Sequence, residues 1–222
     1  MITPYGRFTV IKILIISVVL IAFAFISGII FKIIFLFLSI LLMLFTLYFF
    51  RDPERKVPTL EDGEVISPAD GKIVSIKNIT GNGDFFSKTD KLIQISIFLS
   101  PLNVHVNRFP ISGKITYFEY IPGKFVAAFE EIASEQNERT EIGIETAQGY
   151  RLLFKQISGY IARRIVCPID VGDTAKAGER FGMIKFGSRM DLIFDENCEV
   201  LLKEGDKVIA GVTKMIMFKK QA

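Results

Sequence analysis

A glycine–serine pair near the C-terminus is the first candidate for chemistry in this chain. Gly187 and Ser188 lie within Phe186-Gly-Ser-Arg-Met-Asp191. A serine hydroxyl attacks a carbonyl effectively only when a nearby base removes its proton. The segment is not the nucleophile elbow of a serine hydrolase, because Phe186 and Met190 stand where that motif has glycines. By itself, a Gly-Ser pair is more typical of a turn.

The one histidine of the chain, His105, is a candidate for proton transfer. In the segment Ser100–Arg108, strand-like alternation places His105 on a polar face between Asn103 and Asn107. An exposed surface histidine is the plainer interpretation. Because imidazole titrates near neutral pH, a general acid or base is the functional interpretation.

Asp70 is the third candidate, and it lies in Ser67-Pro-Ala-Asp-Gly71. Proline followed by Asp-Gly is the composition of a turn, so a turn is the simpler interpretation. The order Asp70, His105, Ser188 is compatible with a hydrolase triad, but order alone establishes none.

Metal chemistry is not expected. The two cysteines, Cys167 and Cys198, have no metal-ligand spacing, and a single histidine makes a zinc site improbable. We predict two unpaired thiols in a reducing compartment.

The hydrophobic residues are unevenly distributed. Half of the 222 residues are hydrophobic, and between Val10 and Phe50 only Lys12 and Lys32 carry charge. This pattern excludes a purely soluble protein, a polytopic transporter and a disordered chain. A net charge of +3 is too small to indicate nucleic-acid binding.

Residues 1–50 are expected to anchor the chain in a membrane. The apolar block has room for two spanning helices, Ile13–Ile30 and Ile33–Phe50. Lys32 falls between them, beside Ser27 and Gly28, where a tight connection could form. One long bent helix or a re-entrant element is the competing interpretation. A hairpin places the basic residues on both flanks, such as Arg7 and Arg51, on one side, which the positive-inside rule makes the cytoplasm.

Residues 51–222 are expected to form a mainly β domain. Turn sequences such as Asp70-Gly71 and Gly205-Asp206 separate short β-branched stretches, of which Leu92–Leu99 is the clearest. Apolar spacing predicts one amphipathic helix within Lys124–Arg139. Gly172–Gly178 recurs weakly as Gly205–Gly211, as in the folded-over lipoyl and biotinyl carrier domains. The expected fold is therefore a compact antiparallel β sandwich with one short helix, preceded by a transmembrane helical hairpin.

Several segments in register resemble one known family, the short form of phosphatidylserine decarboxylase. They occur in the order Ile66–Ile73, Leu99–Arg108, Asn137–Arg139, Ala162–Ile165, Gly178–Arg180 and Phe186–Arg189. The apolar block followed by Phe50-Arg-Asp-Pro53 is also similar to that family. The resemblance covers nearly the whole chain.

The resemblance implies a pyruvoyl-dependent enzyme made as an inactive precursor. Similar enzymes cut themselves between glycine and serine, which here means Gly187 and Ser188. Attack by the Ser188 hydroxyl and subsequent elimination leave a pyruvoyl group at residue 188. Through a Schiff base, that group decarboxylates phosphatidylserine to phosphatidylethanolamine and CO2, without a metal or an external cofactor.

The resemblance also implies roles for other residues. Asp70 and His105 match positions assigned to self-cleavage and proton transfer. Longer relatives carry two histidines here, and Arg108 replaces the second. Arg108, Arg163 and Arg164 are candidates for binding the substrate phosphate or carboxylate, since guanidinium pairs with both.

The implied partners are phosphatidylserine, membrane lipid and the two fragments of self-cleavage, residues 1–187 and 188–222, which would form a heterodimer. Further homo-oligomerisation is left open. A membrane-tethered β-sandwich carrier or binding module is the alternative from another class, although the exposed modified lysine of lipoyl-type carriers has no counterpart. A membrane-anchored serine hydrolase is a third interpretation, which the missing nucleophile elbow opposes.

Overall fold

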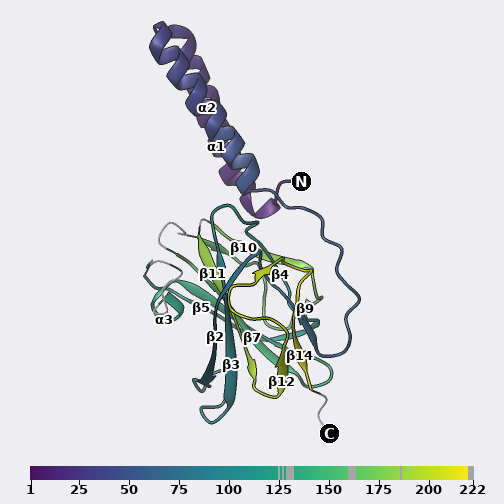
Figure 1. Ribbon diagram of the computed structural model, residues 1–222. Coiled ribbons are helices and arrows are strands. Elements are labelled where there is room, and N and C mark those ends of the chain that lie inside the picture. Colours follow the sequence, from purple (N-terminus) through teal and green to yellow (C-terminus); the bar gives the residue numbers. More distant parts are fainter. Residues whose placement is uncertain (125, 127, 129–132, 160–163, 186, 220–222) are drawn as a thin grey trace. The chain divides into compact units, whose positions relative to one another are not determined.

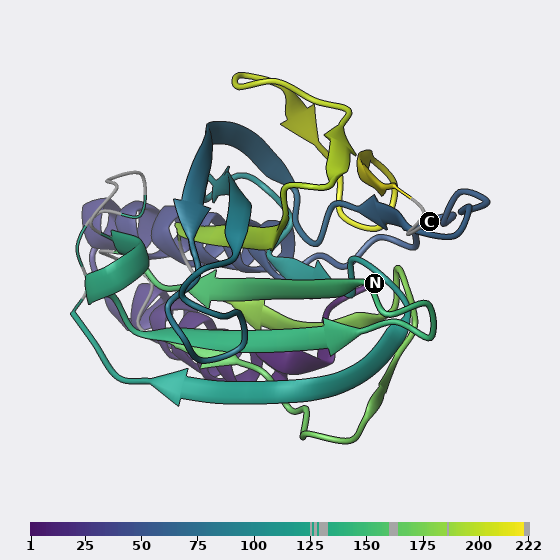
Figure 2. The ribbon, with the colours of Figure 1, turned by 90° about the horizontal axis from the view of Figure 1, so that it is seen from below.

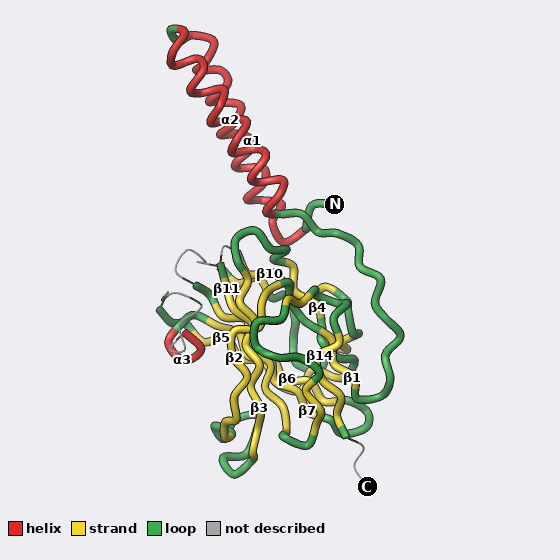
Figure 3. The backbone as a smooth tube through the Cα atoms, viewed as in Figure 1, coloured by secondary structure: helices red, strands yellow, loops and turns green. Residues whose placement is uncertain are grey.

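The structure, a computed structural model, describes residues 1–124, 126, 128, 133–159, 164–185 and 187–219 (Figure 1). The chain divides into two compact units, Met1–Glu54 and Arg55–Ala222. The first is helical and the second is built of strands (Figure 3).

The helical unit is an antiparallel pair. A short 3-10 turn, η1 (Pro4–Gly6), leads into α1 (Arg7–Ile26), and α2 (Ile29–Phe49) returns. By length and composition, both are long and apolar enough to cross a bilayer. These two apolar helices associate the protein with a membrane.

The connection between the helices lies at Ser27 and Gly28, as predicted, but the helix bounds differ from the predicted ones. Ser27 and Gly28 have extended backbone, with ψ angles of 158° and 162°, so the turn lies there. Lys32 is therefore not between the helices but in the first turn of α2, where its N–H donates to the Gly28 carbonyl at 3.0 Å. Glycine supports a helix less well than the surrounding isoleucines and phenylalanines, which favours a break at Gly28.

Small residues line the contact between α1 and α2. Ser17 and Ala24 of α1, and Ser39 of α2, are fully buried. The Ser39 hydroxyl donates to the Ser17 carbonyl at 3.1 Å. Small and hydroxylated side chains let apolar helices approach closely where hydrophobic attraction between them is weak. The contact rules out a single long helix.

The second unit contains all the strands. They are β1 (Glu64–Ile66), β2 (Gly71–Thr80), β3 (Lys91–Leu99), β4 (Val106–Arg108), β5 (Gly113–Ile121), β6 (Arg139–Glu145), β7 (Arg151–Ile157), β8 (Ile165–Val166), β9 (Thr174–Ala175), β10 (Arg180–Ile184), β11 (Ser188–Asp195), β12 (Cys198–Val200), β13 (Lys207–Val208) and β14 (Lys214–Phe218).

These strands form one large sheet and two small ones. The eight-stranded sheet has the order β13-β2-β3-β11-β7-β6-β5-β9, and the three-stranded sheets have the orders β1-β14-β12 and β4-β10-β8. Every pairing between these strands is antiparallel, and the large sheet is curled (Figure 2). The prediction of a mainly β, antiparallel fold after two apolar helices is confirmed.

The curled sheet encloses the main core on its inner face. Alternate residues of the central strands point inward, among them Ile95, Ile97, Phe154 and Leu192, each fully buried. On the outer face a smaller apolar cluster forms where a loop lays Phe85 and neighbouring aromatic rings over the strands.

The weak repeat seen in the sequence extends to its partner strands. The Gly211 N–H donates to the Ser67 carbonyl, and the Gly178 N–H donates to the Phe109 carbonyl, both at 2.8 Å. Strands β2 and β5 pair with β13 and β9 in the same register, and each contains a register shift at the equivalent place. The β unit is thus built from two similar halves.

The predicted helix within Lys124–Arg139 is shorter than expected. The described part is α3 (Ala133–Gln136), whereas Lys124 forms a bridge with Asn137, and Arg139 begins β6. Phe125, Phe129 and Ile132, on which that prediction rested, lie outside the described residues.

Candidate active site

Ser188 lies at the start of the central strand β11, with a neighbouring strand on each side. It pairs with Leu99 of β3, and the next residue, Arg189, pairs with both β3 and β7. The Ser188 side chain is fully buried, and its Oγ has no hydrogen-bond partner among the described residues. A buried hydroxyl without a partner costs about 1–3 kcal/mol, so this position is not optimised for stability alone.

Gly187 supplies the backbone conformation that precedes this strand. Its φ is +61°, in the left-handed region that glycine adopts without strain. Apart from its two chain neighbours, no described residue has an atom within 4 Å of the position that a Cβ would take there.

Asp70 lies just before β2, at the same end of the sheet as Ser188. Because β2, β3 and β11 are consecutive neighbours, the two residues are two strands apart, about 10 Å between backbones. The Asp70 carboxylate pairs with Arg55 at 2.8 Å and accepts the Ala210 N–H at 2.9 Å. The turn predicted around Asp70 is present, and its carboxylate is ion-paired with Arg55.

His105 is not a surface histidine, which corrects the plainer sequence interpretation. Its side chain is fully buried, in the loop between β3 and β4. Nδ1 lies 2.9 Å from the Asn103 carbonyl, which can only accept, so Nδ1 carries the hydrogen and Nε2 of the neutral ring is a proton acceptor. The His105 carbonyl accepts the Ile184 N–H at 3.4 Å, which places His105 beside the segment that leads to Ser188.

A buried polar layer lies in the interior below Ser188, and the sequence analysis missed it. Gln156 of β7 pairs with Met190 of β11, next to Ser188 on the inward face. Its Nε2 donates to Asn107 Oδ1 at 2.9 Å, and its Oε1 accepts the Thr140 hydroxyl at 2.8 Å. Such a network fixes side-chain orientation at the end of the core.

Ser158 and Gly159 follow β7 and lie opposite the Gly-Ser pair. The ladder pairs Arg189 with Ile157, so its continuation places Ser188 opposite Ser158 and Gly187 opposite Gly159. The Ser158 side chain is fully buried, and its Oγ has no partner among the described residues. Only the strand register could have revealed this neighbour.

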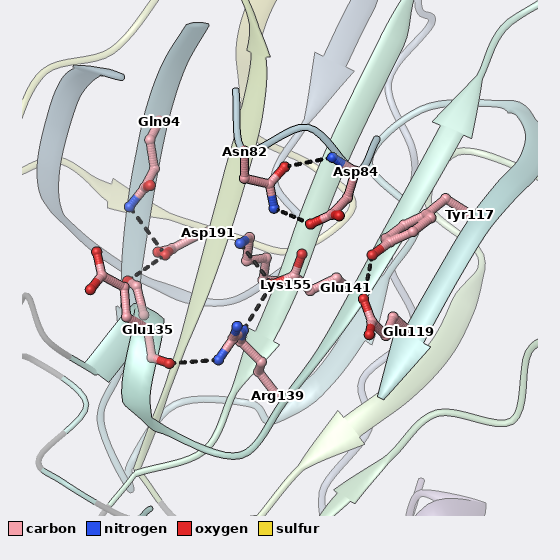
Figure 4. Close-up of polar contacts among 11 residues, drawn as sticks. Asn82, Asp84, Gln94, Tyr117, Glu119, Glu135, Arg139, Glu141, Lys155 and Asp191 are labelled. Carbon is pink, nitrogen blue, oxygen red and sulfur yellow. Dashed lines mark hydrogen bonds and ion pairs between the residues drawn. The ribbon is translucent and has the colours of Figure 1, made fainter. Parts of the chain in front are cut away.

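Arg189 and Asp191 anchor β11 from its outer face. Both are buried, and the Arg189 Nε lies 2.6 Å from Asp191 Oδ1. Arg189 also donates to the Ser96 hydroxyl at 2.6 Å. Asp191 accepts from Gln94 at 3.2 Å, a contact drawn in Figure 4, and from Ser134 at 2.7 Å. A satisfied buried pair of this kind fixes the strand that carries Ser188.

The outer face of the sheet also carries a groove of about 510 Å³. Its polar wall includes Glu141, which lies 2.8 Å from both Arg139 and Lys155 (Figure 4). Burial alone would raise the Glu141 pKa, but the two cations lower it overall. Since Ser188 points to the opposite face, this groove is separate from the candidate active site.

The three candidate arginines differ in placement. Arg108 is buried, and its Nη1 donates to the Gly178 carbonyl at 2.8 Å, so it ties β4 to the turn at Gly178. Arg164 is exposed, and its carbonyl accepts the Lys185 N–H. Burial and the Arg164 charge lower the pKa of Lys185. Arg163 lies outside the described residues.

The cysteines are unpaired and have weakly acidic thiols. Burial raises the pKa of Cys167 to about 12 and that of Cys198 to about 11. Among the described residues, no cluster of His, Cys, Asp and Glu is suited to hold a metal ion.

The fold and this site define a membrane-associated β protein with a serine and a histidine enclosed at one end of its sheet. Comparison with known proteins specifies it further. The profile of the phosphatidylserine decarboxylase family matches residues 42–215. The chain belongs to that family.

Several similar relatives carry the name phosphatidylserine decarboxylase proenzyme. That of Chlorobium chlorochromatii is 44% identical over 96% of this chain and 98% of its own length. That of Pelodictyon phaeoclathratiforme is 46% identical over 96% of this chain and 98% of its own length. That of Chlorobaculum parvum is 48% identical over 79% of this chain and 80% of its own length.

Proposed function

We propose that this chain is a proenzyme that cuts itself between Gly187 and Ser188 and then decarboxylates phosphatidylserine to phosphatidylethanolamine and CO2. The observation that carries the proposal is the full-length similarity to proenzymes of this name, combined with a buried Gly-Ser pair at the start of β11. The enzyme is a carboxy-lyase.

Self-cleavage begins with the Ser188 hydroxyl. Its oxygen adds to the Gly187 carbonyl carbon, the peptide C–N bond breaks, and the nitrogen takes up the proton, which leaves an ester. Removal of the Ser188 α-proton then breaks the Cβ–Oγ bond and releases Gly187 as a carboxylate. Water hydrolyses the remaining enamine, through its imine tautomer, to a keto group and ammonia.

The surroundings of residue 188 fit the resulting pyruvoyl group. Because Ser188 Oγ makes no hydrogen bond to a described residue, conversion of this side chain leaves no described partner unsatisfied. When present, the group supplies a carbonyl that condenses with the substrate amine and accepts electrons as CO2 leaves. Pairing of β11 on both sides holds residue 188 in place as a new N-terminus.

We assign the acid–base work to Asp70 and His105. Asp70 is the candidate for activating Ser188, and Arg55 orients its carboxylate. His105 serves decarboxylation at least as much as cleavage, since its Nε2 is the proton-accepting nitrogen of the neutral ring. Arg108, Arg163 and Arg164 remain candidates for the substrate phosphate or carboxylate.

The two fragments are expected to stay together as a heterodimer. Residues 188–222 supply β11, the strand between β3 and β7, as well as β12, β13 and β14. Loss of this fragment would open the core of the β unit. Basic residues on both flanks of the helical pair favour the cytoplasmic face for the catalytic unit.

The direct test of the reaction is CO2 release from phosphatidylserine in vesicles. Purified wild-type protein should release CO2 and form phosphatidylethanolamine without an added cofactor, and Ser188→Ala should release none. CO2 release by Ser188→Ala at the wild-type rate would refute the assignment.

A further inference from the structure

Gly159 lies directly against the carbonyl of the peptide that is proposed to be cut. A Cβ built at Gly159 would overlap the Gly187 carbonyl oxygen and lie 3.2 Å from the carbonyl carbon. The same position would be 3.0 Å from the Ala128 Cβ. A glycine hydrogen fits where a methyl group does not, so the Gly187 carbonyl oxygen packs directly against the Gly159 α-carbon.

The backbone that carries Gly159 is fixed by its neighbours. The Ser158 N–H donates to the Glu138 carbonyl at 2.9 Å, and the Ser158 carbonyl accepts from Asn137 Nδ2 at 2.7 Å. Asn137 is fully buried and also bonds both backbone polar groups of Val126 at 2.8 Å. These bonds hold Ser158 in place and therefore oppose a shift of Gly159 away from the Gly187 carbonyl.

The Gly187 side of the contact has more room. The volume around the missing Cβ of Gly187 is empty of described atoms within 4 Å, and its φ of +61° belongs to glycine's own region. The overlap would thus be relieved mainly by displacement of the Gly187 carbonyl. That carbonyl is the electrophile in self-cleavage, and its angle to Ser188 Oγ decides the rate of attack.

We propose that Gly159 is a positioning residue for self-cleavage, because its lack of a side chain seats the Gly187 carbonyl for attack by Ser188. The inference depends on the proposed function, since it concerns the same cleavage. It makes Gly159 a requirement for processing, although Gly159 takes no part in bond making.

The test compares Gly159→Ala with Gly113→Ala in the full chain. Gly113 is a matched control, because a Cβ there would also press on a backbone carbonyl oxygen, that of Glu145, at 2.5 Å. Gly113 is the first residue of β5 and lies at the end of the sheet opposite to Ser188. We expect both variants to fold, with Gly113→Ala cut at the wild-type rate. Gly159→Ala should be cut about 100-fold more slowly, the effect of a misplacement of about 1 Å.

Hydroxylamine shows which step is affected. It cleaves an ester but not a peptide, forming a hydroxamate at Gly187 and freeing the Ser188 hydroxyl. In uncut Gly159→Ala protein, hydroxylamine should release no fragment 188–222, because the ester is not reached. Release to the extent seen with freshly made wild-type proenzyme would overturn the proposal.

A double variant separates the carbonyl contact from simple crowding. Gly159→Ala with Ala128→Gly removes the neighbouring methyl group but keeps the overlap with Gly187. The double variant should still be cut about 100-fold more slowly than wild type. Restored cutting would overturn the proposal, as would failure of both the single and double variants to fold, because the proposal requires a local displacement. A wild-type chain that is never cut at 187–188 would instead refute the proposed function itself.

Discussion

Asp70 and Ser112 occupy equivalent positions in the two halves of the β unit. Asp70 Oδ1 accepts the Ala210 N–H at 2.9 Å, and Ser112 Oγ accepts the Ala177 N–H at the same distance. Either side chain can close its turn, so the turn does not require a carboxylate. Only Asp70 has a second oxygen to pair with Arg55. The turn therefore does not account for the negative charge of the Asp70 carboxylate, which fits a role in the reaction instead.

This equivalence gives a mutation that separates structure from catalysis. Asp70→Ser should keep the turn closed, as Ser112 does, and remain nearly as stable as wild type. It should cut itself at least about 100-fold more slowly, since it lacks the proposed base. Gel analysis of fragment 188–222 measures the cutting, and urea unfolding measures the stability.

The control is Ser112→Ala. It should lose about 1 kcal/mol of stability, the value of one hydrogen bond, and cut normally. Wild-type cutting by Asp70→Ser would show that the Asp70 carboxylate is not needed.

His105 should separate turnover from cutting. His105→Gln and His105→Ala should still produce fragment 188–222, at least in part, because Asp70 is proposed to activate Ser188. Both should lose about 10²–10⁴-fold in CO2 release, the usual effect of removing a general acid or base. The opposite pattern, with His105→Ala wholly uncut and Asp70→Asn cut normally, would make His105 the base for cleavage.

The buried pair of Arg189 and Asp191 should be important for stability. In the uncut Ser188→Ala background, Asp191→Asn should lower the free energy of unfolding by about 3–5 kcal/mol, because it leaves Arg189 buried without its counter-charge. Glu119→Gln, at an exposed hydrogen bond to Tyr117, should cost less than about 1 kcal/mol. Equal effects in urea titrations would contradict the anchoring role.

Removal of the helical pair should affect turnover on membranes more than cutting. A protein lacking residues 1–50 keeps Arg55 and every proposed site residue, so it should still cut itself. Its turnover on vesicles should fall, because the helices no longer hold it at the lipid surface. Equal turnover of the truncated and full chains on vesicles would show that the helices are not a functional tether.

The fold class and the division of the chain into short strands were predictable from local sequence patterns. Alternation in Leu92–Leu99 and the Asp-Gly turns indicate an antiparallel β domain without any knowledge of pairing. The alternation in this segment marks one apolar face, yet Gln94 and Ser96 on the other face are also buried. Arg189 and Asp191 bond those two residues from the adjacent strand, a partner that local sequence does not reveal.

The rest of the candidate site depends on strand register. Ser158-Gly159 has the composition of any loop, and only the pairing of β7 with β11 places it opposite Gly187-Ser188. The burial of His105 was also missed, because alternation describes faces of a strand and this residue lies in a loop. Contacts between distant segments could not be read from residue spacing.

The central claim is self-cleavage at one peptide bond, and the mass of the purified protein tests it most directly. Mass spectrometry of denatured wild-type protein should find two chains, residues 1–187 and residues 188–222, the latter with a pyruvoyl group in place of Ser188. Ser188→Ala should give a single uncut chain. An active wild-type protein with the mass of the intact 222-residue chain would contradict the account.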